Sequence, residues 1–214
     1  IAQKVDAIIV APTDSSGIAP VIAEARAKGI PVFTADIAAH GADVVSHIAS
    51  DNERGGVLLA QYLAEKLGGE GKIAIIDHPT VASVQDRTRG FIETLAAYPG
   101  ISIVQRAPGE GQRDKAMRAC QDILQAHPDL AAIFGINDDS ALGALAAVEA
   151  AGLQDRILIV GFDGTPEALQ AIRAGKALKA DAVQYPDKIG VKTIQIIANH
   201  LAGQEVPKVV PVEV

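Results

Sequence analysis

The sequence predicts an α/β fold with mostly parallel sheets, and three observations support this prediction. Apolar stretches of strand length alternate with amphipathic stretches of helix length along the chain. Hydrophobic residues make up 49% of the 214 residues and aromatic residues only 3%, which favours helices that pack on a sheet through small aliphatic side chains. Residues 157–160 are apolar and three of the four are β-branched, as in a strand buried on both faces, and a helix start follows at Thr165 and Pro166.

The N-terminal quarter of the chain begins with a predicted strand at residues 5–10, which Pro12 closes. The helix that follows has an expected apolar stripe of Ile18, Val21, Ile22 and Ala25, and it ends at Gly29, because glycine favours the position after a helix. The other elements expected here are a strand at residues 31–34, an extended segment at 44–50 and a helix that begins at 51–52 and stops at 68–69.

The remaining sequence continues the alternation of strands and helices. Asp138 or Asp139 is expected to cap the helix that runs to Ala150. The other expected strands are residues 72–76, 101–104, 131–134 and 178–183, and the other expected helices are 81–97, 113–125 and 186–201.

Composition excludes several classes of function. The net charge is −7 and no basic run is present, which argues against nucleic-acid binding, because phosphate backbones need clusters of Lys and Arg. No apolar run reaches the ~20 residues that span a bilayer.

No signal peptide is recognisable, and the chain opens at Ile1, so we expect it to derive from a longer protein. Cys120 is the only cysteine and is expected to be an inert core thiol.

Enzyme motifs are absent from the sequence. There is no glycine-rich dinucleotide or triphosphate motif and no serine nucleophile elbow. Residues 161–165 faintly resemble the Asp-x-Asp-Gly-Thr motif of phosphatases, but Gly161 stands in the nucleophile's place. The five histidines lack the spacing of metal ligands. We therefore predict no catalytic residue, no metal site and no cofactor.

Polar residues recur where predicted strands end, and these are the candidate ligand-binding residues. The carboxyl ends of parallel strands form the rim at which open α/β sheets bind ligands. Arg, carboxylate and amide groups together supply donors and acceptors of both kinds, which suits a neutral polyhydroxyl ligand. The candidates are Asp36, Asn137, Asp163 and Gln184 at strand ends, together with Arg87 in the opening turns of its helix.

Two of these candidates also have a structural interpretation. Asp163 can cap the turn before the next helix without touching a ligand. Arg87 lies on the apolar face that Val84 and Phe91 share, near the helix N-terminus, where a cation is unfavourable. Either its side chain reaches solvent along that face or it has a functional partner.

Three motifs carry a resemblance to a known family. Residues 44–52, 137–145 and 160–166 closely resemble the periplasmic ribose-binding proteins, in the same order and spacing. The lactose-repressor family is similar in the same core. The resemblance implies a type I periplasmic binding protein fold, with two Rossmann-like lobes that close on a sugar. It implies a first lobe at residues 1–50 and 185–211 and a second lobe at 51–184, with hinges near 50–52, 184–187 and 211–213.

The resemblance makes Asp36, Arg87, Asn137, Asp163 and Gln184 sugar-binding residues by motif match, and it places Ile37 and Gly111 beside the ligand. Ile37 stands where ribose binders carry Arg, and Gly111 stands where they carry an aromatic residue, so ribose itself is not implied. The family's first strand, helix and strand have no counterpart before Ile1. We therefore expect residues 5–10 to be an exposed sheet edge, open to self-association. Either a partner completes this first lobe, or the lobe rearranges and sugar affinity is largely lost.

These expectations combine into one predicted function. The chain is expected to be a solute-binding protein of an ABC importer that binds a small neutral sugar or polyol. Its expected partner is the transporter permease, and its expected location is periplasmic or extracellular, lipid-anchored or soluble. The alternatives are the effector-binding core of a lactose-repressor-family regulator and, third, an enzyme on a Rossmann-like fold.

Overall fold

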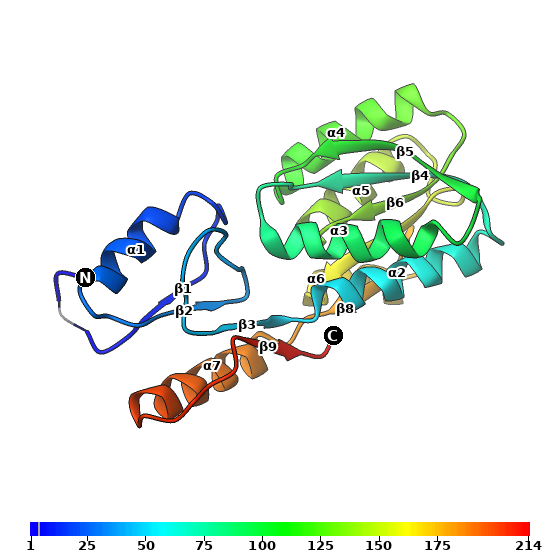
Figure 1. Cartoon of the computed structure of the whole chain (residues 1–214). Helices are drawn as coiled ribbons and strands as arrows, with labels where there is room; N and C mark the ends of the chain where they lie inside the picture. The colour runs from blue at the N-terminus through cyan, green and yellow to red at the C-terminus, as the bar shows by residue number, and fades with distance from the viewer. Residues whose placement is uncertain (4) are drawn as a thin grey trace. The chain divides into compact units, whose positions relative to one another are not determined.

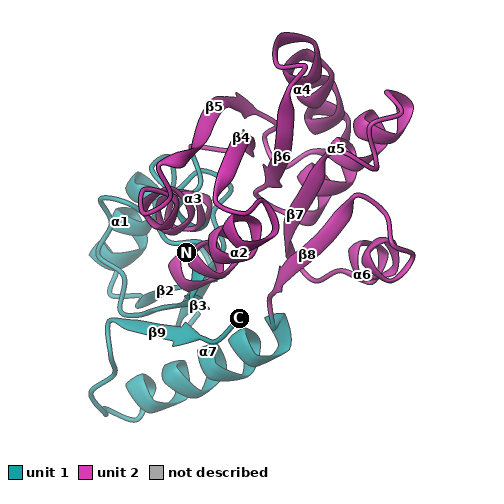
Figure 2. Ribbon diagram, turned by 90° about the vertical axis from the view of Figure 1, so that its right-hand side faces the viewer, with its two compact units in different colours: residues 1–52, 80–83, 185–214 teal, residues 53–79, 84–184 magenta. Residues whose placement is uncertain are grey.

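The computed structural model describes residues 1–3 and 5–214 of the chain. Strands and helices alternate along these residues, as the sequence predicts, except that β3 follows β2 without a helix between them, and the elements divide into two compact units (Figures 1 and 2). Unit 1 contains residues 1–52, 80–83 and 185–214, and unit 2 contains residues 53–79 and 84–184. The hinge positions expected from the sequence stay a prediction. Within the described residues, none of the helices combines the length and the apolar character that a membrane crossing requires.

Unit 1 is built on a parallel sheet in the order β1-β2-β3-β9. The helices α1 (Ala19–Ala27) and α7 (Pro186–Leu201) belong to this unit, and Ile189 of α7 packs with Ile48 and Val212 of the sheet. A second small core joins Ile22 and Ala25 of α1 to Val32 of β2. The strands are β1 (Ile8–Val10), β2 (Val32–Ala35), β3 (His47–Ser50) and β9 (Val209–Val212).

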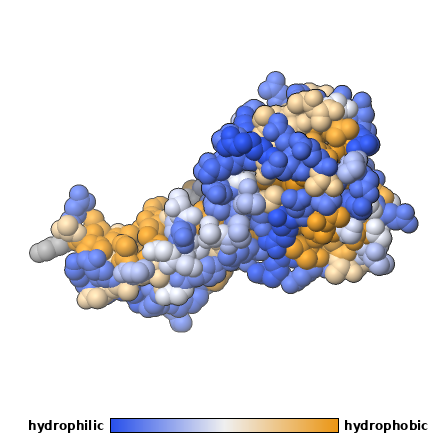
Figure 3. Space-filling model, turned by 90° about the horizontal axis from the view of Figure 1, so that it is seen from above, coloured by the Kyte–Doolittle hydropathy of each residue, from blue (hydrophilic) through white to orange (hydrophobic). Residues whose placement is uncertain are grey.

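Strand β1 lies at the end of the strand order of this sheet, and it is shorter than the strand expected at residues 5–10. Ile9 of β1 is 45% exposed and Val21 of α1 is 52% exposed. Figure 3 shows apolar surface in this N-terminal part of unit 1. The expected apolar stripe of α1 was therefore wrong at Val21, whereas Ile22 and Ala25 are buried in the core and Ile18 packs against it.

Unit 2 is a parallel sheet in the order β5-β4-β6-β7-β8, with helices on both faces (Figure 2). The helices α4, α5 and α6 cover one face through a single large core, and α2 and α3 lie on the other face. The strands are β4 (Glu70–Asp77), β5 (Gly100–Pro108), β6 (Leu130–Gly135), β7 (Leu158–Asp163) and β8 (Leu178–Val183). The helices are α2 (Asn52–Lys66), α3 (Ala82–Leu95), α4 (Arg113–Ala126), α5 (Asp138–Ala150) and α6 (Pro166–Arg173).

Two glycines let α2 and α3 approach each other closely. A Cβ atom at Gly56 would lie 2.0 Å from the Arg87 carbonyl oxygen, and one at Gly90 would lie 2.2 Å from the Glu53 carbonyl oxygen. On the sheet side, the Phe91 ring of α3 stacks on Phe134 of β6 with ring centroids 4.5 Å apart. These contacts determine how closely α3 packs against α2 and against the sheet. They therefore fix the backbone position of Arg87.

Because all five strands of unit 2 run in parallel, their carboxyl ends lie along one edge of the sheet. Strand β7 ends at Asp163 and β8 at Val183, so Gln184 directly follows the sheet. Asn137 lies between the end of β6 and the start of α5. The fold therefore brings three of the predicted site residues to the same edge of unit 2.

Candidate functional site

Asp163 is the last residue of β7, and its backbone has a φ of 133°, an unusual value for a residue with a side chain. Its Oδ1 accepts a hydrogen bond from Gln184 Nε2 at 2.6 Å, and its Oδ2 accepts one from the Asp138 backbone N–H at 3.3 Å. The side chain keeps 27% of its surface exposed. Burial raises the pKa of Asp163 to about 6, and the nearby Arg87 charge offsets part of that effect.

Arg87 is buried at 4% exposure and has defined partners. Its Nη1 donates to the Ile136 carbonyl oxygen at 2.8 Å and lies 3.6 Å from Asp163 Oδ1. The guanidinium carbon lies 3.7 Å from the centroid of the Phe162 ring, a cation–π arrangement. The alternative in which Arg87 reaches solvent is therefore wrong, because stacking and pairing hold the charge inside unit 2.

Asn137 is the N-cap of α5. Its side-chain oxygen accepts from the Ser140 backbone N–H at 2.9 Å, and its Nδ2 donates to the Gly111 carbonyl oxygen at 3.2 Å. The expectation that Asp138 or Asp139 caps this helix was wrong, because Asn137 already occupies the capping position one residue earlier. The expected cap of α6 is confirmed, since the Thr165 hydroxyl accepts from the Ala168 backbone N–H.

Gly111 lies next to this cluster, and its φ of 65° suits glycine. A Cβ atom there would lie 3.3 Å from Asn137 Nδ2 and 3.6 Å from His78 Nδ1. His78 directly follows Asp77, the last residue of β4, and is not among the candidate residues predicted from the sequence. Its position after a strand was the signal that could have identified it.

Asp36 belongs to unit 1, where it follows the last residue of β2, and its φ is 66°. Its backbone N–H donates to the Ile48 carbonyl oxygen at 2.8 Å, and the backbone N–H of Ile37 donates to the Ala35 carbonyl oxygen at the same distance. The structure thus brings Arg87, Asn137, Asp163 and Gln184 together in unit 2 and places Asp36 and Ile37 at a strand end of unit 1.

Two further carboxylates, Asp138 and Asp181, lie near Asp163, and neither is among the ligand-binding candidates predicted from the sequence. Asp138 Oδ2 accepts from the Thr165 backbone N–H at 2.6 Å, and Asp181 Oδ2 accepts from the Gly164 backbone N–H at 3.2 Å. Asp181 lies inside β8, so no strand-end signal marks it. The role of Asp181 depends on its neighbour Asp138, which belongs to α5. The sequence alone does not show that these two residues are neighbours.

The side chains in this cluster can form hydrogen bonds and charge pairs.

Cys120 lies outside this cluster, in the core. Burial raises the pKa of the Cys120 thiol to about 12, so that side chain remains an uncharged core residue. Across residues 1–3 and 5–214, His, Cys, Asp and Glu form no group of three that could hold a metal ion.

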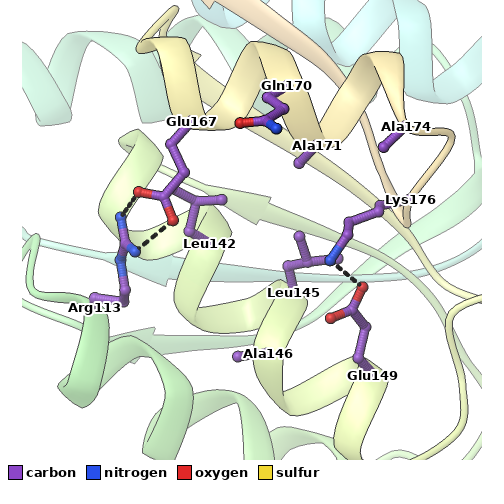
Figure 4. Close-up of a pocket in the computed structure, with 10 residues that line it drawn as sticks. All are labelled: Arg113, Leu142, Leu145, Ala146, Glu149, Glu167, Gln170, Ala171, Ala174 and Lys176. Atoms are coloured by element: carbon purple, nitrogen blue, oxygen red, sulfur yellow. Dashed lines mark hydrogen bonds and ion pairs between the residues drawn. The ribbon is translucent and has the colours of Figure 1, made fainter.

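A groove of about 370 Å³ lies elsewhere on unit 2, over α5 and α6 (Figure 4). Its floor contains Leu142 and Leu145, and ion pairs of Arg113 with Glu167 and of Lys176 with Glu149 border it. It contains none of the predicted ligand-binding residues. Because charged side chains that already satisfy one another form its polar rim, we assign it no ligand.

Comparison with known proteins assigns the chain to a family. Residues 1–205 match the model of the periplasmic binding protein domain. The ribose import binding protein of Salmonella typhimurium is 38% identical over 207 residues, which cover 96% of this chain and 69% of that protein.

Solved structures give the same assignment. A glucose-galactose binding protein from Geobacillus stearothermophilus matches with a TM-score of 0.94 and 34% identity, over 99% of this chain and 76% of that one. An ABC transporter periplasmic solute binding protein from Actinobacillus succinogenes, solved with bound D-allose, matches with a TM-score of 0.89 and 34% identity, over 99% and 77%. The chain therefore belongs to the periplasmic binding protein family, among its ribose-binding-protein-like members.

Proposed function

We propose that this chain is the solute-binding protein of an ABC importer and that it binds a small neutral sugar or polyol. The observation that carries the proposal is the cluster of Arg87, Asn137, Asp163 and Gln184 at one sheet edge of unit 2. One cation and one carboxylate lie 3.6 Å apart in it, so their charges largely offset each other. A neutral ligand with many hydroxyls fits this balance better than an anion or a cation does.

Each residue of the cluster has a distinct proposed role. The Asp163 carboxylate accepts hydrogen bonds from two sugar hydroxyls, and Arg87 donates to the sugar from its planar fork. The amides of Asn137 and Gln184 donate or accept as the hydroxyl pattern requires. From unit 1, Asp36 is proposed as a second carboxylate that binds hydroxyls.

Ile37 and Gly111 define how this site differs from that of a ribose binder. Neither can supply the charged fork or the aromatic face expected at these positions, and a Cβ atom at Gly111 would already lie 3.3 Å from Asn137 Nδ2. Relatives are named for ribose, xylitol and D-apiose, and similar structures were solved with D-allose or myo-inositol bound. These names support the ligand class but do not single out one sugar.

The proposed partners follow from the same family membership. The chain would deliver its ligand to a transporter permease, in the periplasm or outside the cell, as a soluble or lipid-anchored protein. It would bind no nucleic acid and would carry out no catalysis. The relatives for ribose and D-apiose are named as import binding proteins, so we do not propose the alternative of a transcription regulator.

A thermal-shift screen of pentoses, hexoses and alditols tests the ligand class. A ligand that binds only the folded state raises the unfolding midpoint as its concentration increases. We expect at least one neutral sugar or polyol to do so, and sugar phosphates to have less effect. Turnover of a sugar, a sugar phosphate or a nucleotide by the purified protein would contradict the proposal.

A further inference from the structure

The turn at Gly164 and Thr165 is held by two carboxylates that the proposed sugar contacts do not include. Asp181 of β8 accepts from the Gly164 backbone N–H at 3.2 Å, and Asp138 of α5 accepts from the Thr165 backbone N–H at 2.6 Å. Each carboxylate uses its Oδ2 atom for this bond. The turn directly follows Asp163, so these two residues help to fix the direction of the proposed sugar-binding carboxylate.

The second oxygen of each carboxylate, Oδ1, has no hydrogen-bond donor among the described residues. Asp138 Oδ1 and Asp181 Oδ1 are both shielded from solvent and accept no hydrogen bond from a donor among the described residues. Asp138 as a whole is only 2% exposed. Buried polar atoms in native proteins are nearly always hydrogen-bonded, so two such atoms in one place require an explanation.

Both oxygens face the space that Gly161 leaves open. A Cβ atom on Gly161 would lie 3.1 Å from Asp138 Oδ1 and 3.4 Å from Asp181 Oδ1, and the two carboxyl groups contact each other. Two ionised carboxylates in contact repel each other strongly. A single proton between the two Oδ1 atoms removes that repulsion and gives each buried atom a partner.

We propose that Asp138 and Asp181 share one proton at neutral pH, and that this pair is a positioning device for Asp163. One carboxyl group donates through its Oδ1–H, the other accepts at its Oδ1, and the pair carries one negative charge instead of two. The two Oδ2 atoms remain free to accept from the Gly164 and Thr165 backbones. The pair thereby holds the turn that presents the Asp163 carboxylate.

The charges around the pair agree with this assignment. Burial, the contact with Asp138 and the negative charge of Asp163 together raise the pKa of Asp181 to about 9. Arg87 lies 3.6 Å from Asp163, and Arg113 pairs with Asp139 and Glu167. Asp163 has a φ of 133°, and such backbone strain persists only where several contacts fix the residue. The carboxyl pair holds the two residues that directly follow Asp163.

Carbon-13 NMR of the aspartate carboxyl groups tests the shared proton directly, in the full chain and without any sugar. We expect the wild type to have one carboxyl titration above pH 7 and expect it to be missing in Asp181→Asn. Asp155→Asn makes the same charge change at an exposed position and should keep this titration. Titration of both carboxyl groups in the ordinary range of aspartate would overturn the proposal. So would shifts of their signals when Mg²⁺ or Ca²⁺ is added, because a cation would then neutralise the pair.

Stability against pH gives a second readout. The folded-state pKa of Asp181 lies above its ordinary value of 3.8, so the folded chain retains a proton that the unfolded chain loses. The stability contribution is complete below about pH 4 and is lost as the pH rises toward about 9. The unfolding constant of the wild type should therefore rise, relative to Asp181→Asn, by up to about tenfold per pH unit in this window. A constant ratio between the two proteins would contradict a shared proton.

Sugar affinity tests the positioning role, and this arm rests on the proposed function. Asparagine keeps the acceptor for Gly164 and donates to Asp138, so Asp181→Asn should bind within about threefold of the wild type. Asp181→Ala removes both bonds and should weaken binding by about ten- to a hundredfold. Equal losses in the two variants would overturn the positioning role. If neither the wild type nor any variant binds sugar, the proposed function is wrong. The NMR experiment still tests the shared proton, because it is carried out without sugar.

Discussion

At the scale of single residues, the site is governed by opposing effects on Asp163. Burial favours the neutral carboxyl group, whereas Arg87, Gln184 and the Asp138 backbone N–H favour the carboxylate. The Asp163 side chain is therefore ionised at neutral pH. Because its pKa is about 6, mildly acidic solution protonates it.

The substitution Asp163→Ala should weaken binding of the best sugar by roughly ten- to a hundredfold. Removing a charged hydrogen-bond partner costs about 1.5–3 kcal/mol, and the substitution also removes the carboxylate that lies 3.6 Å from the buried Arg87. Calorimetry on the variant and on Asp155→Asn measures this, and the control should bind like the wild type. An unchanged affinity for Asp163→Ala would refute the assigned role.

Sugar affinity should also fall in acid. Because the pKa of Asp163 is raised to about 6, the ionised form dominates above that pH and is lost below it. The dissociation constant should therefore rise by up to about tenfold for each pH unit below 6. Affinities measured between pH 4.5 and 8 test this prediction, with Asp163→Asn as the comparison. A flat profile in the wild type would mean that Asp163 does not bind the ligand as a carboxylate.

Some residue roles could be predicted from the sequence and others could not. Asp163 ends a strand, Asn137 and Gln184 follow strands, and the parallel sheet brings all three to one edge. Asp138 was expected to cap α5 because aspartate favours that position, but Asn137 takes it and frees Asp138 to contact Thr165. The pairing of Asp138 with Asp181 depends on the neighbouring positions of α5 and β8, which one sequence without its fold does not reveal.

At the scale of elements, the strand and helix pattern was predicted closely, and the differences have local causes. The expected strand at residues 101–104 extends to Gly100–Pro108, because β5 pairs with β4 along its whole length. The close approach of α2 and α3 was not predicted, since glycines at Gly56 and Gly90 could equally have marked weak points in two helices.

Replacing Gly56 with alanine should destabilise the protein by about 1–3 kcal/mol or more, since the new methyl group would lie 2.0 Å from the Arg87 carbonyl oxygen. Gly190→Ala is the matched control, because Gly190 is an exposed position of helix α7 with no atom within 4 Å of a Cβ. Alanine there should stabilise the protein by about 0.5–1 kcal/mol. Urea unfolding measures both changes, and equal effects would disprove the close contact.

At the scale of the whole molecule, the two-lobe fold was predicted from the family resemblance, whereas the strand orders of the sheets were not predicted, because they are set by tertiary contacts that periodicity does not encode. The expectation that residues 5–10 form a sheet edge agrees with the position of β1 at the end of the unit 1 sheet. That unit forms a regular parallel sheet among the described residues. Self-association through this edge stays a prediction.

Self-association should depend on β1 and weaken when its exposed face is charged. Ile9→Lys places a charge on the exposed position of the edge strand, where lysine discourages pairing with another chain. Light scattering over a range of protein concentrations should detect a smaller associated fraction for this variant than for Val191→Lys, an equally apolar exposed position on α7. Identical behaviour of the two variants, or a strictly monomeric wild type, would count against the edge as an interface.

Calorimetric titration of the chain with neutral sugars, beside Asp163→Ala and Asp155→Asn, tests the central claim most directly. The account predicts saturable binding of at least one pentose, hexose or alditol by the wild type and Asp155→Asn. It predicts binding about ten- to a hundredfold weaker in Asp163→Ala. Absence of binding to every neutral sugar, or equal affinity in all three proteins, would contradict the account.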